Sequence, residues 1–172
     1  MTDISERTLA DVIGIPHFVA AMQRGMARFA DYRALMPNVA RAYTRTLLEK
    51  RDDYELVAML WAPASRSPIH DHGDSRCWVV VLEGAIDVDN YERLDDDERT
   101  PNLRPTSNER VARGSIDHRL NDRELHRVQN RTDAPAFSLQ LYASPLGEYT
   151  IADDLTGLWR RMPSHYDAIF DL

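Results

Sequence analysis

Apolar side chains recur with a helical period near the beginning of the chain. Between residues 16 and 35 they lie three or four positions apart, which predicts an amphipathic helix beginning at Pro16. A second helix is expected to begin near Pro37 and to carry residues 39–43. The helical part of the chain is therefore expected to cover about residues 1–50.

The period then changes to one that is typical of strands. Short runs rich in β-branched and aromatic residues, separated by Gly, Pro, Asp and Asn, predict strands over residues 54–62, 77–84, 85–94 and 136–144. Several short strands after a helical stretch indicate a mainly β fold. We expect a small antiparallel barrel or double-sheet jelly roll over about residues 51–150, with a helical cap.

Two polar or mixed stretches complete this picture. The charged residues 95–110 predict a solvated loop or hairpin tip. The tail is expected to pack back on the barrel through its apolar side chains, which are Leu158, Trp159, Tyr166 and Phe170.

Composition is that of one globular domain spanning residues 1–172. Hydrophobic residues make up 43% of the chain and charged residues 28%, and the length allows a core of ordinary size. No apolar run approaches the roughly 18 residues that a membrane span needs. The acidic start does not fit a secretory signal, so we expect a cytoplasmic monomer without membrane contact. The net charge of -7 argues against nucleic acid as a partner, because phosphate binding favours a basic surface.

Two histidines one residue apart stand in the stretch SPIHDHGDSRCW, residues 67–78. In an extended strand, side chains at positions i and i+2 share a face, so His70 and His72 can reach one metal ion while Asp71 points away. Such a pair by itself is a weak signal, because two histidines also fall near a loop by chance.

Further residues strengthen the metal interpretation. The spacing from His72 to Cys77 and Gly84 is similar to the first cupin motif, with Cys77 where that motif has a glutamate. The stretch HRVQN supplies His126 and Asn130, similar to the end of the second cupin motif. Three histidines are therefore expected to converge in the mouth of a barrel.

A site of three neutral imidazoles without a carboxylate leaves the charge of a metal ion uncompensated. This favours an anionic substrate such as a thiolate and leaves open coordination positions, so we expect a catalytic site. The other histidines, His17, His118 and His165, are expected to be surface residues or to support the site indirectly. The lone Cys77 cannot form an internal disulfide, which agrees with a reducing compartment.

Taken together, these residues resemble the cysteine dioxygenase family, in which a cupin fold holds ferrous iron and a thiol is oxidised to a sulfinic acid. The resemblance is carried by YTRTL (43–47), SPIHDHGDSRCW (67–78), LHRVQN (125–130) and FSLQLYASP (137–145). It covers about residues 40–150, and it implies that His70, His72 and His126 bind Fe(2+). It also implies that Arg45 binds the substrate carboxylate with help from Tyr43. Without the resemblance, Arg45 would be interpreted as an arginine on a helix surface.

The stretch SLQLY alternates in character, so Ser138, Gln140 and Tyr142 are expected to share one face of a strand. The family carries Ser-His-Tyr here, a hydrogen-bonded relay beside the reacting sulfur. Gln140 replaces the histidine, and an amide cannot gain or lose a proton near neutral pH. The resemblance also aligns Cys77 with a cysteine that some members join to the tyrosine by a thioether. A Cys77–Tyr142 crosslink is therefore one expectation, and a buried packing thiol is the other.

The resemblance implies an iron-dependent thiol dioxygenase whose partners are a small carboxylated thiol and O2. L-cysteine is the first candidate substrate, and 3-mercaptopropionate, mercaptosuccinate and a thiohistidine stay open because of Gln140. Two other functions of this fold also stay open, namely a zinc or manganese cupin isomerase or lyase and a non-enzymatic ligand-binding cupin. Oxygen uptake with a thiol separates all three.

Overall fold

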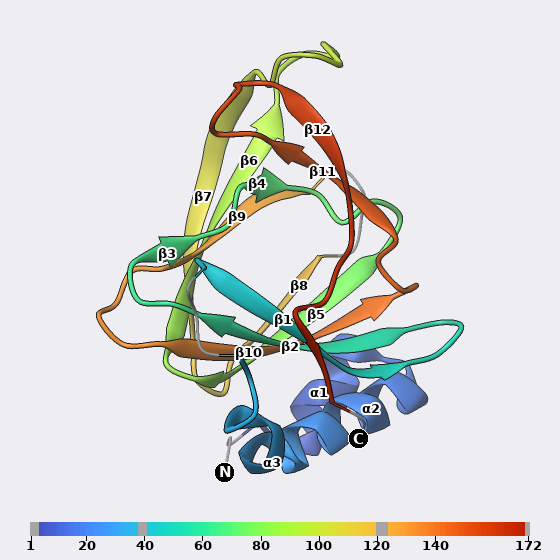
Figure 1. The fold of residues 1–172 in the computed structure, drawn as a ribbon. Coiled ribbons are helices and arrows are strands. Elements are labelled where there is room, and N and C mark those ends of the chain that lie inside the picture. Colours follow the sequence, from blue (N-terminus) through green and yellow to red (C-terminus); the bar gives the residue numbers. More distant parts are fainter. Residues whose placement is uncertain (1–3, 38–40, 120–123, 171–172) are drawn as a thin grey trace.

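Two β-sheets lie face to face, and short helices cover one of them from the outside (Figure 1). The computed structural model describes residues 4–37, 41–119 and 124–170. One sheet has the strand order β13-β1-β2-β10-β5-β8, and the other has the order β12-β11-β4-β9-β6-β7 with β3 paired to β9. The helices are α1 (Glu6–Ile13), α2 (Pro16–Ala27) and α3 (Phe29–Arg33). The strands are β1 (Tyr43–Lys50), β2 (Glu55–Trp61), β3 (Ser65–Arg66), β4 (Ile69–His70), β5 (Arg76–Glu83), β6 (Ala85–Arg93), β7 (Leu103–Ala112), β8 (Ile116–Arg119), β9 (Leu125–Asn130), β10 (Ala136–Ala143), β11 (Glu148–Ala152), β12 (Trp159–Pro163) and β13 (Ala168–Ile169).

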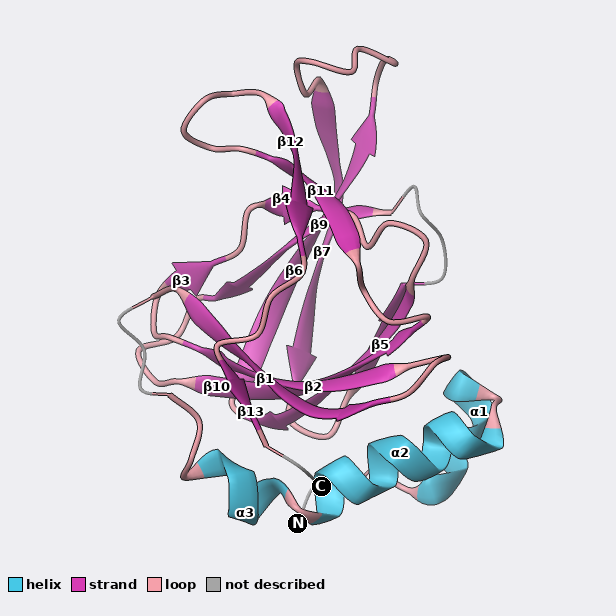
Figure 2. Ribbon diagram, turned by 45° about the vertical axis from the view of Figure 1, so that its right-hand side comes forward, coloured by secondary structure: helices cyan, strands magenta, loops and turns pink. Residues whose placement is uncertain are grey.

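A first apolar layer lies between the helices and the sheet that contains β2 and β10 (Figure 2). Phe18 and Met22 of α2 pack there against the outward-facing leucines of the sheet. Helix α2 comes unusually close at Gly25, where a Cβ atom would lie 2.7 Å from Leu139 Cδ2 and 2.8 Å from Leu56 Cδ2. A glycine at this point lets the helix pack directly on the sheet.

A second apolar layer fills the space between the two sheets. Val57, Met59 and Trp61 of β2 contribute to it, whereas the alternate residues of β2 face the helices. All seven residues of β2 are buried, because both faces of this strand are covered. The continuous apolar run ELVAMLW follows from this position in the middle of the molecule.

The predicted strands agree closely with the structure. β2, β5, β6 and β10 each begin and end within one residue of the predicted ranges. The prediction of a helix from Pro37 was wrong, because Tyr43 begins strand β1; residues 38–40 of that prediction lie outside the described residues. The described helices end at Arg33, so the helical part is shorter than the expected 1–50.

Residues 95–110 form a loop only in their first half. β7 begins at Leu103 and pairs with β6 along its length, although most of its side chains are exposed. Pairing of backbone groups does not require apolar side chains, which is why the polar sequence concealed this strand. The tail packs on the barrel only in part. Tyr166 contacts the core between the sheets and Phe170 contacts the layer under the helices, but Leu158 is exposed and Trp159 belongs to neither core layer.

None of the described helices has the length and apolar character that crossing a membrane would require.

Candidate metal centre

A short segment before β5 carries two of the three predicted histidines. His70 ends β4, whereas His72 lies in a turn after it and not in the extended strand that was predicted. Between them, Asp71 turns toward β11, and its Oδ1 accepts hydrogen bonds from the backbone N–H groups of Gly73 (3.0 Å) and Thr150 (2.8 Å). The Asp71 carboxylate therefore holds the start of the turn that follows His72 against β11.

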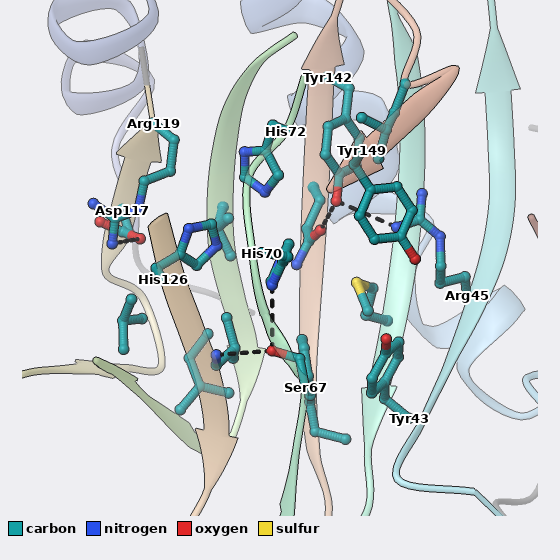
Figure 3. A pocket seen from close by; sticks show the side chains of 18 of the residues that line it. Tyr43, Arg45, Ser67, His70, His72, Asp117, Arg119, His126, Tyr142 and Tyr149 are labelled. Carbon is teal, nitrogen blue, oxygen red and sulfur yellow. Dashed lines mark hydrogen bonds and ion pairs between the residues drawn. The ribbon is translucent and has the colours of Figure 1, made fainter. Parts of the chain in front are cut away.

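His70, His72 and His126 come together inside the barrel (Figure 3). Each offers one ring nitrogen, and these atoms lie within 4.8 Å of one another. The ring centroids are 4.4 Å apart for His70 and His126, and 4.8 Å apart for His72 and His126. His70 and His126 are direct partners on the paired strands β4 and β9, which explains how residues distant in sequence meet. Three imidazoles at this spacing could hold one metal ion.

Burial keeps these three imidazoles neutral, because a low-dielectric surrounding disfavours the charged ring. Burial lowers the pKa of His70 to about 4. Burial, assisted by His70, also lowers the pKa of His72 and of His126 well below the ordinary value. The Nδ1 atom of His70 lies 3.0 Å from the Pro68 carbonyl oxygen, which assigns the proton to Nδ1 and leaves the Nε2 lone pair free for a metal.

Cross-strand pairs bring Cys77 and Tyr142 to the same side of the sheet as the histidines. Cys77 of β5 is the direct partner of Tyr142 on β10, and direct partners of antiparallel strands share a face. The Tyr142 ring lies 5.4 Å from the ring of His72. Cys77 is completely buried, and burial raises the pKa of its thiol.

Ser138, Gln140 and Tyr142 are all buried, but they have different partners. The Tyr142 hydroxyl donates a hydrogen bond to Gln140 Oε1, and both side chains line the cavity. The Ser138 hydroxyl accepts a hydrogen bond of 3.0 Å from Trp61 Nε1. Burial raises the pKa of Tyr142, so its hydroxyl keeps the proton that it donates.

Arg45 lies on β1 and its side chain is buried, so the helix-surface interpretation was wrong. Its Nε donates to the His165 carbonyl oxygen (3.1 Å), and its Nη2 donates to Ser164 Oγ (3.3 Å) and forms an ion pair with Glu55 Oε1 (3.7 Å). Its Nη1 donates to the Tyr142 hydroxyl at 3.5 Å. Burial of Arg45 opposes its charge, but Tyr142 and Glu55 keep the pKa of Arg45 above its ordinary value.

Tyr43 lines the same cavity beside Arg45, and its ring lies 5.0 Å from the ring of Trp61. Burial raises the pKa of Tyr43 to about 12. The cavity beside the histidines has a free volume of about 30 Å³, which is room for one or two water molecules.

Sequence reasoning missed three residues that line this cavity, namely Asp117, Arg119 and Tyr149. The stretch IDHR contains a usable signal, because charged residues at positions 117 and 119 must share one face of a strand. The remaining histidines lie elsewhere. His17 is paired with Asp53 at 2.7 Å on the surface, and the side chains of His118 and His165 are exposed.

The family model for cysteine dioxygenase type I matches residues 1–153 of the chain. The chain belongs to the cysteine dioxygenase type I family. Cysteine dioxygenase type 1 of Bos taurus is 28% identical over 169 residues, covering 90% of this chain and 83% of the bovine one. The human enzyme of the same name is 31% identical over 134 residues, covering 76% of this chain and 61% of its own length.

Solved structures agree on the architecture of this cysteine dioxygenase family member. A Klebsiella pneumoniae protein with a double-stranded β-helix domain has a TM-score of 0.53 at 12% identity, and the alignment covers 71% of this chain and 94% of that one. The cupin domain of Schizosaccharomyces pombe Cnp3 has a TM-score of 0.50 at 10% identity, covering 64% and 71% of the two chains. The prediction of a mainly β cupin fold with N-terminal helices is confirmed.

Family membership makes the protein an enzyme, a cupin thiol dioxygenase that acts on a small thiol with O2. The family consists of metalloenzymes, and the three converging histidines are a donor set that agrees with this.

Proposed function

We propose that this protein is an iron(II)-dependent thiol dioxygenase that converts a small carboxylated thiol to its sulfinate, R-SH + O2 → R-SO2⁻ + H⁺. The sulfur loses four electrons and dioxygen gains four, so no external reductant is required. One observation carries the proposal. Three neutral imidazoles, a buried arginine and a protonated tyrosine open onto a single cavity.

The donor set fits ferrous iron. Imidazole nitrogens are suitable ligands for Fe(2+), and His70, His72 and His126 together would occupy three positions and leave the others open. When bound there, iron(II) supplies coordination positions at which sulfur and dioxygen meet, and the electron transfer that joins them. Among the described residues, no carboxylate belongs to this cluster, so an anionic thiolate would balance part of the charge.

The other side chains position the substrate. Arg45 carries the planar guanidinium that suits a carboxylate, and its Nη1 lies on the Tyr142 side of the cavity. Tyr142 stays protonated, and its hydroxyl donates a hydrogen bond either to Gln140 or to the oxygen atoms that are added to the sulfur. Gln140 orients that hydroxyl without titrating, and Ser138 and Trp61 support the strand behind it.

L-cysteine is the reference substrate, because the curated relatives are named cysteine dioxygenase. The alternatives 3-mercaptopropionate, mercaptosuccinate and a thiohistidine share the thiol and the carboxylate that this cavity would hold. A zinc or manganese isomerase is disfavoured by family membership.

The test is oxygen uptake by the iron-loaded protein across these thiols, with the product identified by mass spectrometry. With ¹⁸O2, both oxygen atoms of the sulfinate should carry the label. His126→Ala and the metal-free protein are the controls, and both should lose activity. Uptake of oxygen without sulfinate formation, or full activity of His126→Ala, would refute the proposal.

A further inference from the structure

A second arginine lines the cavity on β8. Arg119 is 9% exposed and is the direct cross-strand partner of Cys77, so its side chain projects to the same face as the thiol. Figure 3 shows Arg119 and Arg45 on opposite sides of the three histidines. The electrostatic influence of both arginines reaches His70 and His72. The cluster therefore lies between two guanidinium groups.

The guanidinium of Arg119 has unused hydrogen-bonding capacity. Its Nη1 donates to the backbone oxygen of His118 at 3.3 Å. Its Nη2 lies 3.0 Å from Asp117 Oδ2, a charge contact whose geometry does not make a hydrogen bond, and both Nε and Nη2 are buried without a hydrogen-bond partner. Nε and Nη2 form one edge of the guanidinium, the edge that can donate two parallel hydrogen bonds to a carboxylate.

Unpartnered donors of a buried cation are costly, and their presence in a substrate cavity indicates a missing acceptor. Asp117 balances the charge of Arg119 but leaves these donors unsatisfied. Arg45 has a different set of partners, since Glu55, Ser164 and His165 occupy its far side. The two arginines therefore present separate sets of donors on either side of the histidine cluster.

We propose that the preferred substrate is a short thiol bearing two carboxylates, with one carboxylate on Arg45, the other on the Nε–Nη2 edge of Arg119, and the sulfur at the histidines between them. This inference rests on the proposed function and names its substrate class. A thiol with a single carboxylate leaves the donors of Arg119 unpaired. A site built to form hydrogen bonds to a substrate group discriminates strongly against an analogue that lacks the group.

Mercaptosuccinate and 3-mercaptopropionate are a matched pair of probes, because they differ by one carboxylate. The quantity to measure is the ratio of kcat/KM for mercaptosuccinate to kcat/KM for 3-mercaptopropionate, with L-cysteine as a third substrate. The wild-type ratio should exceed about tenfold. Arg119→Gln should lower this ratio by at least about tenfold, and Arg119→Lys, which keeps the charge but loses the paired donors, should give an intermediate ratio.

Arg127→Gln is the control. The Arg127 side chain is as buried as that of Arg119, each being 10% exposed, and it pairs with Asp154 outside the cavity. Loss of this ion pair should leave the substrate ratio unchanged, even where it lowers the melting temperature. Circular dichroism and the melting temperature of each variant report whether the fold is kept. If Arg119→Gln does not fold, the ratio of the two kcat/KM values in Arg119→Lys tests the proposal instead.

Anaerobic calorimetry supplies a readout that does not depend on turnover. Succinate should bind the wild-type protein at least about tenfold more tightly than propionate, and Arg119→Gln should remove this preference. If no thiol is oxidised but succinate shows the Arg119-dependent preference, the proposed function fails and the second anion site stands. A ratio near one in the wild-type protein, or an equal loss for both probes in Arg119→Gln, would overturn the two-carboxylate inference while leaving the dioxygenase proposal intact.

Discussion

Arg45 is oriented by the protein on one side and faces the cavity on the other. The His165 carbonyl oxygen and Ser164 Oγ accept hydrogen bonds from its Nε and Nη2, and Asp167 Oδ2 accepts one from its backbone N–H. Glu55, which is completely buried, lies 3.7 Å from Nη2. A guanidinium held in this way does not lose further side-chain freedom when a substrate carboxylate arrives.

Replacing Arg45 by lysine should raise KM for every carboxylated thiol by at least about tenfold, because the planar guanidinium held in place by His165 and Ser164 is lost. The full truncation Arg45→Ala should cost about 2–5 kcal/mol of substrate binding. The lysine variant keeps a positive charge beside Glu55, so its melting temperature should fall less than that of Arg45→Ala. Steady-state kinetics and thermal unfolding check both statements. An unchanged KM in both variants would show that the carboxylate binds elsewhere.

Cys77 and Tyr142 form the residue pair for which we propose a thioether bond. They are direct partners on adjacent strands, and burial raises the pKa of the thiol, so Cys77 is not a reactive thiolate by itself. Any crosslink should therefore depend on turnover at the metal, with O2 as the oxidant that removes one hydrogen from the thiol and one from the ring.

Intact-protein mass spectrometry after turnover in air should show a loss of about 2 Da, which should be absent in Cys77→Ala and in the metal-free protein. Thiol titration of the unfolded protein should fall in parallel. If Cys77 stays fully titratable after many turnovers, it is a packing residue and Tyr142 acts through its hydroxyl alone.

At the scale of elements, the turn between β4 and β5 determines where His72 lies. Gly73 has φ +52°, and a Cβ atom there would lie 2.6 Å from the Glu148 carbonyl oxygen of β11. The turn can pack against β11 only with a glycine at this position. The position of His72 therefore depends on a contact between this turn and β11, which the local motif does not contain.

Gly73→Ala should destabilise the protein and weaken iron binding. The left-handed backbone alone costs about 1–2 kcal/mol with a side chain present, and the clash with β11 adds to this and displaces His72. Gly114→Ala is the matched control, because Gly114 has φ +80° and nothing within 4 Å of the added Cβ. Thermal unfolding and iron stoichiometry should be affected more in Gly73→Ala than in Gly114→Ala. Equal losses of stability and iron binding in the two variants would mean that the left-handed backbone, and not the clash with β11, causes them.

The candidate site was predictable from sequence where its signals are local. The spacing of His70 and His72, and the alternation around Tyr142, are properties of single short segments. Arg45 was predicted only through the family resemblance, because the segment alone suggested a residue on a helix surface, whereas its burial depends on pairing with β2 and on the tail. Arg119 was missed because β8 spans only four residues and its cross-strand partner Cys77 is distant in the sequence.

At the scale of the whole molecule, Glu49 joins the helical layer to the barrel. Its carboxylate on β1 accepts hydrogen bonds from Arg24 Nη2 of α2 (2.9 Å to Oε2), from the Tyr54 hydroxyl (2.7 Å to Oε1) and from Arg51 Nε (3.0 Å to Oε1). Burial by itself would raise the pKa of Glu49, but these hydrogen bonds outweigh it and hold the pKa below the ordinary 4.5. The ionised form therefore stabilises the folded state.

Glu49→Gln should lower the free energy of unfolding by about 1.5–3 kcal/mol near pH 7, because the hydrogen bonds lose their charged acceptor. A depressed folded-state pKa gives stability that is complete above the unfolded-state value and disappears as the pH falls through the folded-state value. The difference between wild type and variant should therefore shrink below about pH 4.5. Urea unfolding at pH 7 and pH 4 measures it, with the exposed Glu148→Gln as control. A difference that does not depend on pH would contradict the role of ionised Glu49.

The fold as a whole was easier to predict than its full set of strands. The strands with two covered faces, such as β2 and β10, produced unmistakable apolar runs. β1 and β7 carry polar residues and owe their strand conformation to neighbouring strands, so a pattern read from one segment at a time could not identify them.

The contacts that orient Arg45 come from residues 119 to 122 positions further along the chain. Synthesis proceeds from the N-terminus, so every strand that carries a histidine leaves the ribosome before Ser164 and His165 do. The three histidines are thus all synthesised while Arg45 still lacks the contacts with Ser164, His165 and Asp167. The order of synthesis therefore places the residues that would bind the metal before the residues that complete the support of the arginine.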